Sequence, residues 1–271
     1  MLFNIHTHSE HSHDAQAKLD DLCEQALKEG LLGFAVTDHC DCECAADPKA
    51  FTSLLDSWDD CRRAKALYGD RLTLACGVEI GEALYDPAFA RRVIEARPWD
   101  VVLGSVHAVR VPGWEAPFSI MDFTDCGEAF IRDYMRQYFD DLYEMASTED
   151  YDVLCHLTVP LRYLCGKYGK RVEIEGYYPA IEEILRVCIA RDKTFEINTS
   201  GCAPDAPHFI PDEAILDKYL AMGGRNLTVG SDAHVAERLT NGLEQAAEML
   251  RSKGVTVLTY YLNRRPVKYT I

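Results

Sequence analysis

The sequence has few positive charges for its size. Its 271 residues include 28 Lys and Arg against 44 Asp and Glu, which gives a formal net charge of −16 at pH 7. Nucleic-acid binding draws most of its affinity from basic side chains that neutralise phosphates, and no Lys/Arg cluster of the needed size is present. The composition therefore argues against a polynucleotide partner. It leaves a small phosphate ester open, because bound divalent cations can make a pocket locally positive.

The sequence also lacks a long apolar segment. No stretch contains the roughly 20 consecutive apolar residues of a membrane-spanning helix. The N-terminus reaches His6 without the basic and apolar regions of a signal peptide. We therefore expect a cytoplasmic protein with no membrane partner, and the oligomeric state stays open. With 48% hydrophobic residues, the chain has the length and core of one α/β barrel, so we expect a single domain over residues 1–271.

The eleven cysteines do not form an obvious disulfide framework. Their number is odd, the chain is too large to need disulfides, and several, such as Cys76 and Cys155, lie inside apolar runs. We interpret most of them as reduced packing residues. Cys40, Cys42 and Cys44 form an array with two interpretations. They could lie in a reduced loop near the substrate pocket, or their thiolates could bind an additional metal ion.

What the sequence does have is seven short apolar runs that each lead into a histidine or an acid. In chain order they read NIHTH, FAVTDH, ACGVE, VVLGSVH, VLCH, TFEIN and LTVGSDAH. As parallel strands of a barrel, these runs would bring their carboxyl ends to one mouth, where barrel enzymes build their sites. The residues at these ends are His6, His8, Asp38, His39, Glu79, His107, His156, Glu196, Asp232 and His234.

These residue types are the ligands that zinc, iron and manganese take in proteins. A single histidine at a strand end is commonly a hydrogen-bonded rim residue. His6 and His8, however, are two residues apart, which places both rings on one face of a strand. Because histidines and acids recur at the same end of seven runs, the sequence favours a metal-dependent hydrolase.

Helical patterns alternate with the apolar runs. Apolar spacing predicts helices over 18–30, 50–69, 126–147, 179–193 and 237–254. In the first of them, Leu19, Leu22, Ala26 and Leu27 share one face, and Gly30 suits a left-handed C-terminal cap. The irregular stretches 40–49, 110–126 and 201–212 follow strand ends, so we expect them to shape the substrate pocket.

The chain resembles a known family in its motifs. HTHSEHSHD, TDH, GVEIG, GSVH, CHL, EINTSG and SDAH, in this order between residues 4 and 250, resemble the polymerase-and-histidinol-phosphatase (PHP) family. CHLTVPLRY, EINTSG and SDAH are most similar to its histidinol-phosphatase branch, which serves histidine biosynthesis. The resemblance implies a distorted seven-stranded (β/α) barrel with a trinuclear metal centre.

The resemblance also implies the ligands of three divalent ions, which would be zinc, iron or manganese. The implied ligands of the first ion are His6, His8, Glu79 and Asp232. Those of the second are Glu79, as a bridge, His107 and His156. Those of the third are His39, His234 and one residue near the SHD segment, where Asp14 is preferred and His13 and His11 are alternatives. We interpret His11 as a rim residue whose replacement leaves the metal content unchanged.

A metal centre of this kind suits phosphate ester hydrolysis. Three divalent ions and three carboxylates would leave a charge of about +3 to attract a phosphate dianion and to activate water for in-line attack. No Ser, Cys or Asp nucleophile with a neighbouring base is apparent, which favours direct attack by water. The leaving alkoxide needs a proton, and Asp38 and His234 are candidates to supply it, alongside water.

Three further residues are candidates for substrate binding. Arg162 lies just past the VLCH run, and its guanidinium can bind phosphate in bidentate geometry, although it could instead pair with a surface acid. Glu196 and Asn198 share one strand face and could bind a polar or amine-bearing substrate, although Asn198 could instead cap the loop that follows.

These residues lead to a choice of substrate. The expected reaction is hydrolysis of L-histidinol phosphate to L-histidinol and phosphate. The alternatives are a nucleotide, sugar phosphate or cyclic phosphodiester as substrate, or a metal-binding barrel without catalysis.

Overall fold

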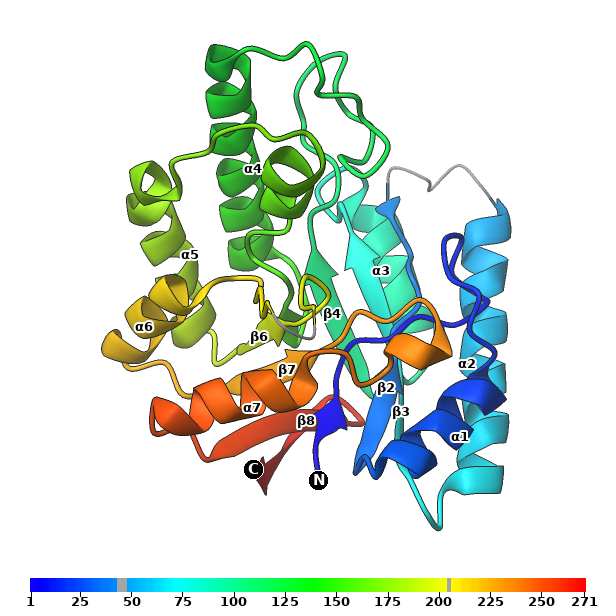
Figure 1. The fold of residues 1–271 in the computed structure, drawn as a ribbon. Helices are drawn as coiled ribbons and strands as arrows, with labels where there is room; N and C mark the ends of the chain where they lie inside the picture. Colours follow the sequence, from blue (N-terminus) through cyan, green and yellow to red (C-terminus); the bar gives the residue numbers. More distant parts are fainter. Residues whose placement is uncertain (43–47, 204–205) are drawn as a thin grey trace.

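The core of the protein is a barrel of seven parallel strands surrounded by helices (Figure 1). The computed structural model describes residues 1–42, 48–203 and 206–271. The barrel strands are β1 (Phe3–Asn4), β2 (Gly33–Val36), β3 (Thr73–Gly81), β4 (Val101–Ser105), β5 (Val153–Leu154), β6 (Thr194–Asn198) and β7 (Leu227–Gly230). Each strand pairs in parallel with the next one in the chain. The predicted seven-stranded (β/α) barrel is confirmed.

The barrel is closed by backbone hydrogen bonds between the segment that continues from β1 and the segment formed by β7 and the residues after it. Ile5 N donates to Val229 O over 3.0 Å, and Asp232 N donates to His6 O over 2.9 Å. These bonds continue past the ends of β1 and β7. They therefore bring the segments that carry His6 and Asp232 side by side at the mouth.

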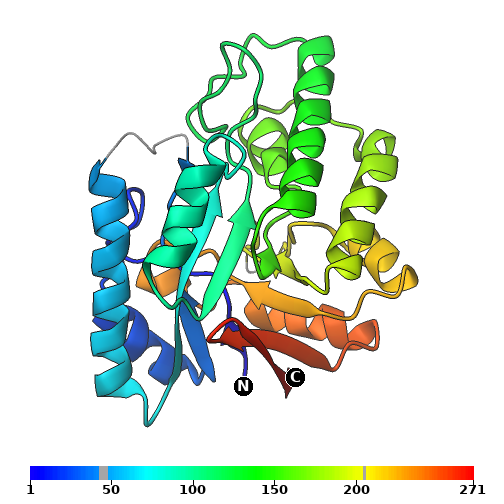
Figure 2. The same cartoon turned by 180° about the vertical axis from the view of Figure 1, so that it is seen from behind.

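The helices lie outside the sheet, as the front and back views show (Figure 1, Figure 2). They are α1 (Leu19–Glu29), α2 (Pro48–Tyr68), α3 (Pro87–Ala96), α4 (Glu128–Thr148), α5 (Tyr178–Ala190), α6 (Glu213–Ala221) and α7 (Leu243–Ser252). Shorter helical turns are the π-helical η2 (Arg162–Lys167) and the 3₁₀ turns η3 (Ile174–Tyr177) and η4 (Ala236–Arg238). None of the helices within the described ranges is long and apolar enough to cross a membrane.

Four of the five predicted helices are confirmed. In α1, Leu19, Leu22 and Ala26 are buried as expected, and Gly30 ends the helix in the left-handed conformation with φ 70°. The prediction of one helix over 237–254 is wrong. The segment begins as the turn η4, and α7 starts only after Gly242, whose φ of 70° cannot continue an α-helix.

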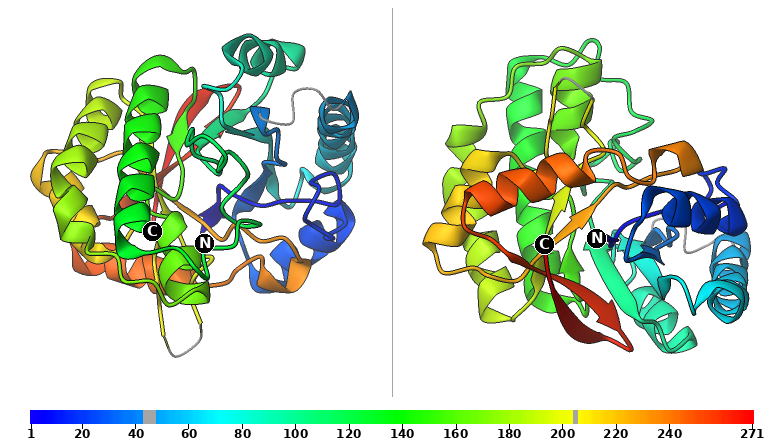
Figure 3. Two further views of the ribbon diagram at one scale, coloured as in Figure 1. Left: turned by 90° about the horizontal axis from the view of Figure 1, so that it is seen from above. Right: turned by 60° about the horizontal axis from the view of Figure 1, so that its bottom comes forward.

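The end of the barrel opposite the mouth is covered by an antiparallel hairpin, β8 (Val257–Leu262) and β9 (Arg265–Thr270). Figure 3 shows this hairpin at the end where both termini lie, and the ring of Tyr260 stacks on Phe3 at 4.4 Å. The barrel interior is filled by apolar side chains, namely Phe3, Ile5, Ala35, Ala75, Val101, Leu103, Val153 and Cys155. A filled interior leaves the mouth as the place where this barrel can bind a ligand.

Candidate metal centre

Glu79, fully buried in β3, lies at the centre of the mouth. Its Oε1 is 2.9 Å from His156 Nε2 and 3.2 Å from His107 Nε2. Its Oε2 faces the other side, where the nearest nitrogens of His6, His39 and His8 lie at 3.0, 3.2 and 3.5 Å. The two carboxylate oxygens thus face two different sets of imidazoles, which is the arrangement of a bridging ligand.

One of these sets combines His6 and His8 with Asp232. The Nε2 atoms of the two histidines are 3.1 Å apart. Asp232 Oδ1 lies 3.2 Å from His8 Nε2 and 3.8 Å from His6 Nε2. These ring nitrogens and the carboxylate oxygen converge on one small volume, as they do around a cation.

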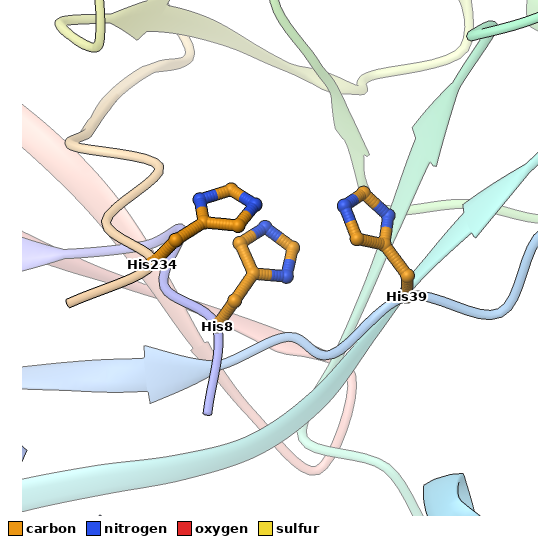
Figure 4. Close-up of side chains that lie close together, drawn as sticks. All are labelled: His8, His39 and His234. Carbon is orange, nitrogen blue, oxygen red and sulfur yellow. The ribbon is translucent and has the colours of Figure 1, made fainter. Parts of the chain in front are cut away.

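A further group, which lies on the side of His39 away from Glu79, consists of Asp14, His39 and His234. Asp14 Oδ2 is 3.2 Å from His234 Nε2 and 3.8 Å from His39 Nε2. Figure 4 shows that His8, His39 and His234 come from separate segments of the chain and lie close together. The ring centroid of His8 is 4.3 Å from that of His39 and 4.4 Å from that of His234.

The structure also places the two alternatives to Asp14. His13 lines the cleft above the mouth, and its ring centroid is 5.4 Å from that of His39. His11 turns toward α2, where its Nε2 lies 3.6 Å from Asp60 Oδ2. Asp14 places an oxygen within 4.0 Å of both His234 Nε2 and His39 Nε2, whereas His11 faces Asp60 instead.

The buried carboxylates create a strongly negative site. Burial alone would lower the pKa of His39, but Glu79 and the neighbouring Asp41 raise it to about 9. Burial would likewise raise the pKa of Glu79, but His6 and the other imidazoles hold it well below its usual range. The arrangement therefore favours positive charge at the mouth, either as protons on the imidazoles or as metal ions.

Two further observations fit divalent metal ions. His39 Nδ1, which faces Glu79 Oε2 at 3.2 Å, is buried and has no hydrogen-bond partner among the described residues. The backbones of His156 and Asp232 have φ values of 22° and 52°, in the left-handed region that residues other than glycine rarely adopt. Strain of this kind gathers at functional sites. Together with the nitrogen and carboxylate donors, these features fit zinc, iron or manganese.

Glu196 and Asn198 lie behind the imidazoles instead of in the cleft. Glu196 Oε1 is 2.8 Å from His6 Nδ1, and its Oε2 accepts a hydrogen bond from His156 N over 2.8 Å. Asn198 Oδ1 accepts from Ser200 N over 3.0 Å. Both residues are fully buried, and neither is among the residues that line the cleft. Their role in substrate binding stays a prediction, and in this structure their side chains face the imidazoles and the backbone after β6.

Asp38 also lies inside the protein, away from the cleft. Its carboxylate is fully buried and accepts hydrogen bonds from the hydroxyls of Ser9, Ser12 and Ser57. Ser12 in turn lies 3.1 Å from His8 Nδ1. Asp38 does not line the cleft, and its role as a proton donor to the leaving group stays a prediction.

Asp41 is a site residue that the sequence motifs did not single out. Its Oδ1 lies 3.4 Å from His107 Nδ1 and 3.6 Å from His39 Nδ1, and it lines the cleft. A Cβ at Gly81 would overlap both Asp41 Oδ1 and His107 Nδ1, so the glycine makes room for this pair. The one signal in the sequence is its spacing, two residues after His39, between two cysteines of the array.

Two cysteines of the array, Cys40 and Cys42, lie within the described residues, and both interpretations of the array stay open. Cys40 and Cys42 are buried in the larger apolar cluster of the protein. Cys44 lies outside the described residues. Cys76, Cys155 and Cys188 are buried as expected.

A cleft of about 650 Å³ opens over the histidine cluster. His6 and His8 are fully buried and do not line it, whereas the other members of the cluster do, namely Asp14, His39, Asp41, Glu79, His107, His156, Asp232 and His234. Phe118 and Tyr163 form part of one wall, with ring centroids 5.3 Å apart. Arg162 lies beside the cluster, where its Nη1 is 3.8 Å from Asp232 Oδ2. The acidic residues among those that line the cleft all belong to the histidine cluster, namely Asp14, Asp41, Glu79 and Asp232.

Comparison with known proteins identifies similar chains. The PHP domain model matches residues 4–200. A Thermotoga maritima protein named "Probable histidinol-phosphatase" is 27% identical over 256 residues, covering 92% of this chain and 91% of its own. A histidinol-phosphatase from Lactococcus lactis is 25% identical over 93% of this chain and 91% of its own.

Solved structures agree with this fold. Histidinol phosphate phosphatase from Lactococcus lactis, crystallised with zinc, L-histidinol and phosphate, superposes with a TM-score of 0.81 at 20% identity over 98% of both chains. The HisK protein of Listeria monocytogenes gives a TM-score of 0.77 at 16% identity, over 90% of this chain and 99% of its own.

Proposed function

The chain belongs to the PHP domain family, and from this premise we propose that it is a metal-dependent phosphatase that hydrolyses a small phosphate monoester. The observation that carries the proposal is the position of Glu79, whose two oxygens face separate sets of imidazoles. The proposed ligands of three divalent ions are His6, His8, Asp14, His39, Glu79, His107, His156, Asp232 and His234.

The residues of the cleft suit direct hydrolysis. Bound divalent cations lower the pKa of water and withdraw charge from a phosphoryl group. Arg162, next to the ligand Asp232, is positioned to hold a phosphoryl oxygen. Of the two predicted proton donors to the leaving alcohol, only His234 lines the cleft.

L-Histidinol phosphate is our first candidate substrate. The support comes from the curated relatives and from the aromatic wall of Phe118 and Tyr163, against which an imidazole ring can stack. One observation favours a second candidate, a nucleotide or sugar phosphate. The described acids that line the cleft all lie in the metal cluster, so the wall offers a substrate amine no carboxylate of its own.

A substrate comparison tests this choice. We expect the metal-loaded protein to hydrolyse L-histidinol phosphate with a higher kcat/KM than nucleoside monophosphates or sugar phosphates. Steady-state release of phosphate measures the difference. A tenfold preference for a nucleotide, about 1.4 kcal/mol in transition-state free energy, would reject the first candidate while leaving metal-dependent hydrolysis in place.

A metal analysis tests the centre itself. Because Glu79 faces two sets of imidazoles, Glu79→Gln should lose about two of three ions, whereas Asp14→Asn should lose about one. Elemental analysis of the purified variants gives both numbers. Equal metal loss in the two variants would remove the bridging role of Glu79, and hydrolysis by metal-free wild-type protein would contradict the proposed function.

A further inference from the structure

Two arginines meet at one residue of the cleft wall. Arg162 Nη1 donates a hydrogen bond to Ser200 Oγ over 3.1 Å, and Arg238 Nη2 donates to Ser200 O over 3.2 Å. All three residues line the cleft. They follow three neighbouring strands, β5, β6 and β7, so the barrel itself brings them together.

The charges of these two arginines are not neutralised by a full ion pair. Among the described residues, no Asp or Glu lies within 4.0 Å of the Arg238 guanidinium, although the chain has 44 acidic residues. The carboxylate near Arg162 is Asp232, at 3.8 Å, and Asp232 also faces His6 and His8. A bound metal ion would compete with Arg162 for that carboxylate.

We propose that Arg162, Ser200 and Arg238 form a phosphate clamp in which Arg238 is a second phosphate-binding arginine. A phosphate dianion on the metal centre has oxygens that point away from the ligands, and guanidinium groups bind such oxygens through paired N–H donors. Ser200 holds both guanidinium groups on the same side of the cleft. The clamp rests on the proposed function, since it assumes that the metal centre receives a phosphoryl group.

Binding of inorganic phosphate to the metal-loaded protein tests the clamp without turnover. Arg238→Ala should weaken phosphate binding about tenfold, as expected for loss of one charge-assisted contact, and Arg162→Ala should weaken it at least as much. Arg238→Lys, which keeps the charge but loses the fork, should lie in between. Isothermal titration calorimetry measures the affinities, and elemental analysis confirms that each variant holds its metals.

The matched control is Arg251→Ala. Arg251 lies on α7, where its Nη1 is 2.9 Å from Glu244 Oε1, and it does not line the cleft. This variant should bind phosphate as the wild type does. Ser200→Ala removes the hydroxyl that holds Arg162 but keeps the carbonyl that holds Arg238. In that background, Arg162→Ala should have a smaller effect, whereas Arg238→Ala should keep its full effect.

Two results would overturn the clamp. One is wild-type phosphate affinity in Arg238→Ala. The other is a variant that binds phosphate esters more weakly but binds inorganic phosphate with unchanged affinity. That result would place Arg238 against the alcohol part of the substrate. If instead Arg238→Ala weakens phosphate binding while no monoester is hydrolysed, the clamp stands and the proposed function fails.

Discussion

At the residue scale, two imidazoles of the mouth, His6 and His107, each have a carboxylate next to Nδ1. His6 Nδ1 faces Glu196, and His107 Nδ1 faces Asp41, so that the Nε2 atom of each ring points toward Glu79. Partners of this kind fix the tautomer and the orientation of a metal-binding histidine. Glycine makes room for each pair, because a Cβ at Gly230 would overlap Glu196 and one at Gly81 would overlap Asp41.

Replacing Asp41 tests this orientation. Asp41→Ala should weaken metal binding about 10- to 100-fold, because His107 loses the partner of its Nδ1. Asp41→Asn keeps an acceptor oxygen and should be milder. Gly81→Ala should resemble Asp41→Ala, because the added methyl group occupies the position of the carboxylate. Competition with a zinc chelator measures the affinities.

The control for the glycine is Gly127→Ala. Apart from its neighbours in the chain, none of the described residues has an atom within 4 Å of a Cβ built at Gly127, and the φ of −78° suits any residue. This variant should bind metal as the wild type does. Wild-type zinc affinity in both Asp41→Ala and Gly81→Ala would show that Asp41 plays no part in orienting His107.

The sequence predicted the positions of the proposed ligands better than their surroundings. The carboxyl ends of parallel strands lie at one mouth of a barrel. Residues at those ends, such as Glu79 and His107, could therefore be predicted from the sequence to lie close together. Periodicity places Glu196 on the inward face of β6, but it does not show whether an inward carboxylate meets a substrate or the back of an imidazole. Asp41 lies in a loop, where no periodicity predicts which side chains turn inward.

At the scale of elements, the long segment between β4 and α4, residues 106–127, forms part of the cleft wall. It lies above the mouth in Figure 1 and contributes Phe118 to the wall. Phe118 N donates to His107 O over 2.8 Å. Farther along, Lys170 Nζ donates to Thr124 O over 2.7 Å and to Cys126 O over 2.9 Å. The segment after η2 thus holds this wall in place.

Lys170→Ala removes both of these hydrogen bonds. We expect the free energy of local opening of residues 118–126 to fall by about 1–2 kcal/mol, with a higher KM and an unchanged metal content. Hydrogen exchange of that segment and steady-state kinetics measure the two effects. Lys28→Ala, at an exposed lysine on α1, is the control. Unchanged exchange in Lys170→Ala would show that other contacts hold the wall.

The helices that could be predicted are those in which apolar residues recur at helical spacing. The apolar spacing that predicted α1, α2, α4 and α5 is the spacing with which these helices pack on the sheet. The single helix over 237–254 failed because Gly242 interrupts a continuous apolar pattern. The hairpin β8–β9 was not predicted, because covering the base of the barrel is a tertiary role that the local pattern does not reveal.

At the scale of the whole molecule, the mouth depends on the closure of the barrel. β1 has only two residues, yet the segment that follows it carries His6 and His8. Asn4, fully buried at the end of β1, joins this segment to the one after β7. Its Nδ2 donates to Ser231 Oγ over 2.7 Å and to Leu239 O over 2.8 Å, and its Oδ1 accepts from Ser231 N over 3.0 Å.

Asn4→Ala should therefore affect stability and metal binding together. It leaves several buried polar groups without partners, so we expect the metal-free protein to lose about 2–4 kcal/mol of unfolding free energy. Metal affinity should fall as well. His6 follows β1 and Asp232 follows β7, so the two side chains can share an ion only while these strands are held together. Urea denaturation and chelator competition measure the two effects.

The control is Asn226→Ala. In the wild type, Asn226 Nδ2 donates a hydrogen bond to the exposed Asp192, so this variant should change the free energy of unfolding by less than about 1 kcal/mol. If Asn4→Ala lost stability but kept wild-type metal affinity, the ligands would be held by each strand separately and the closure would not be part of the site.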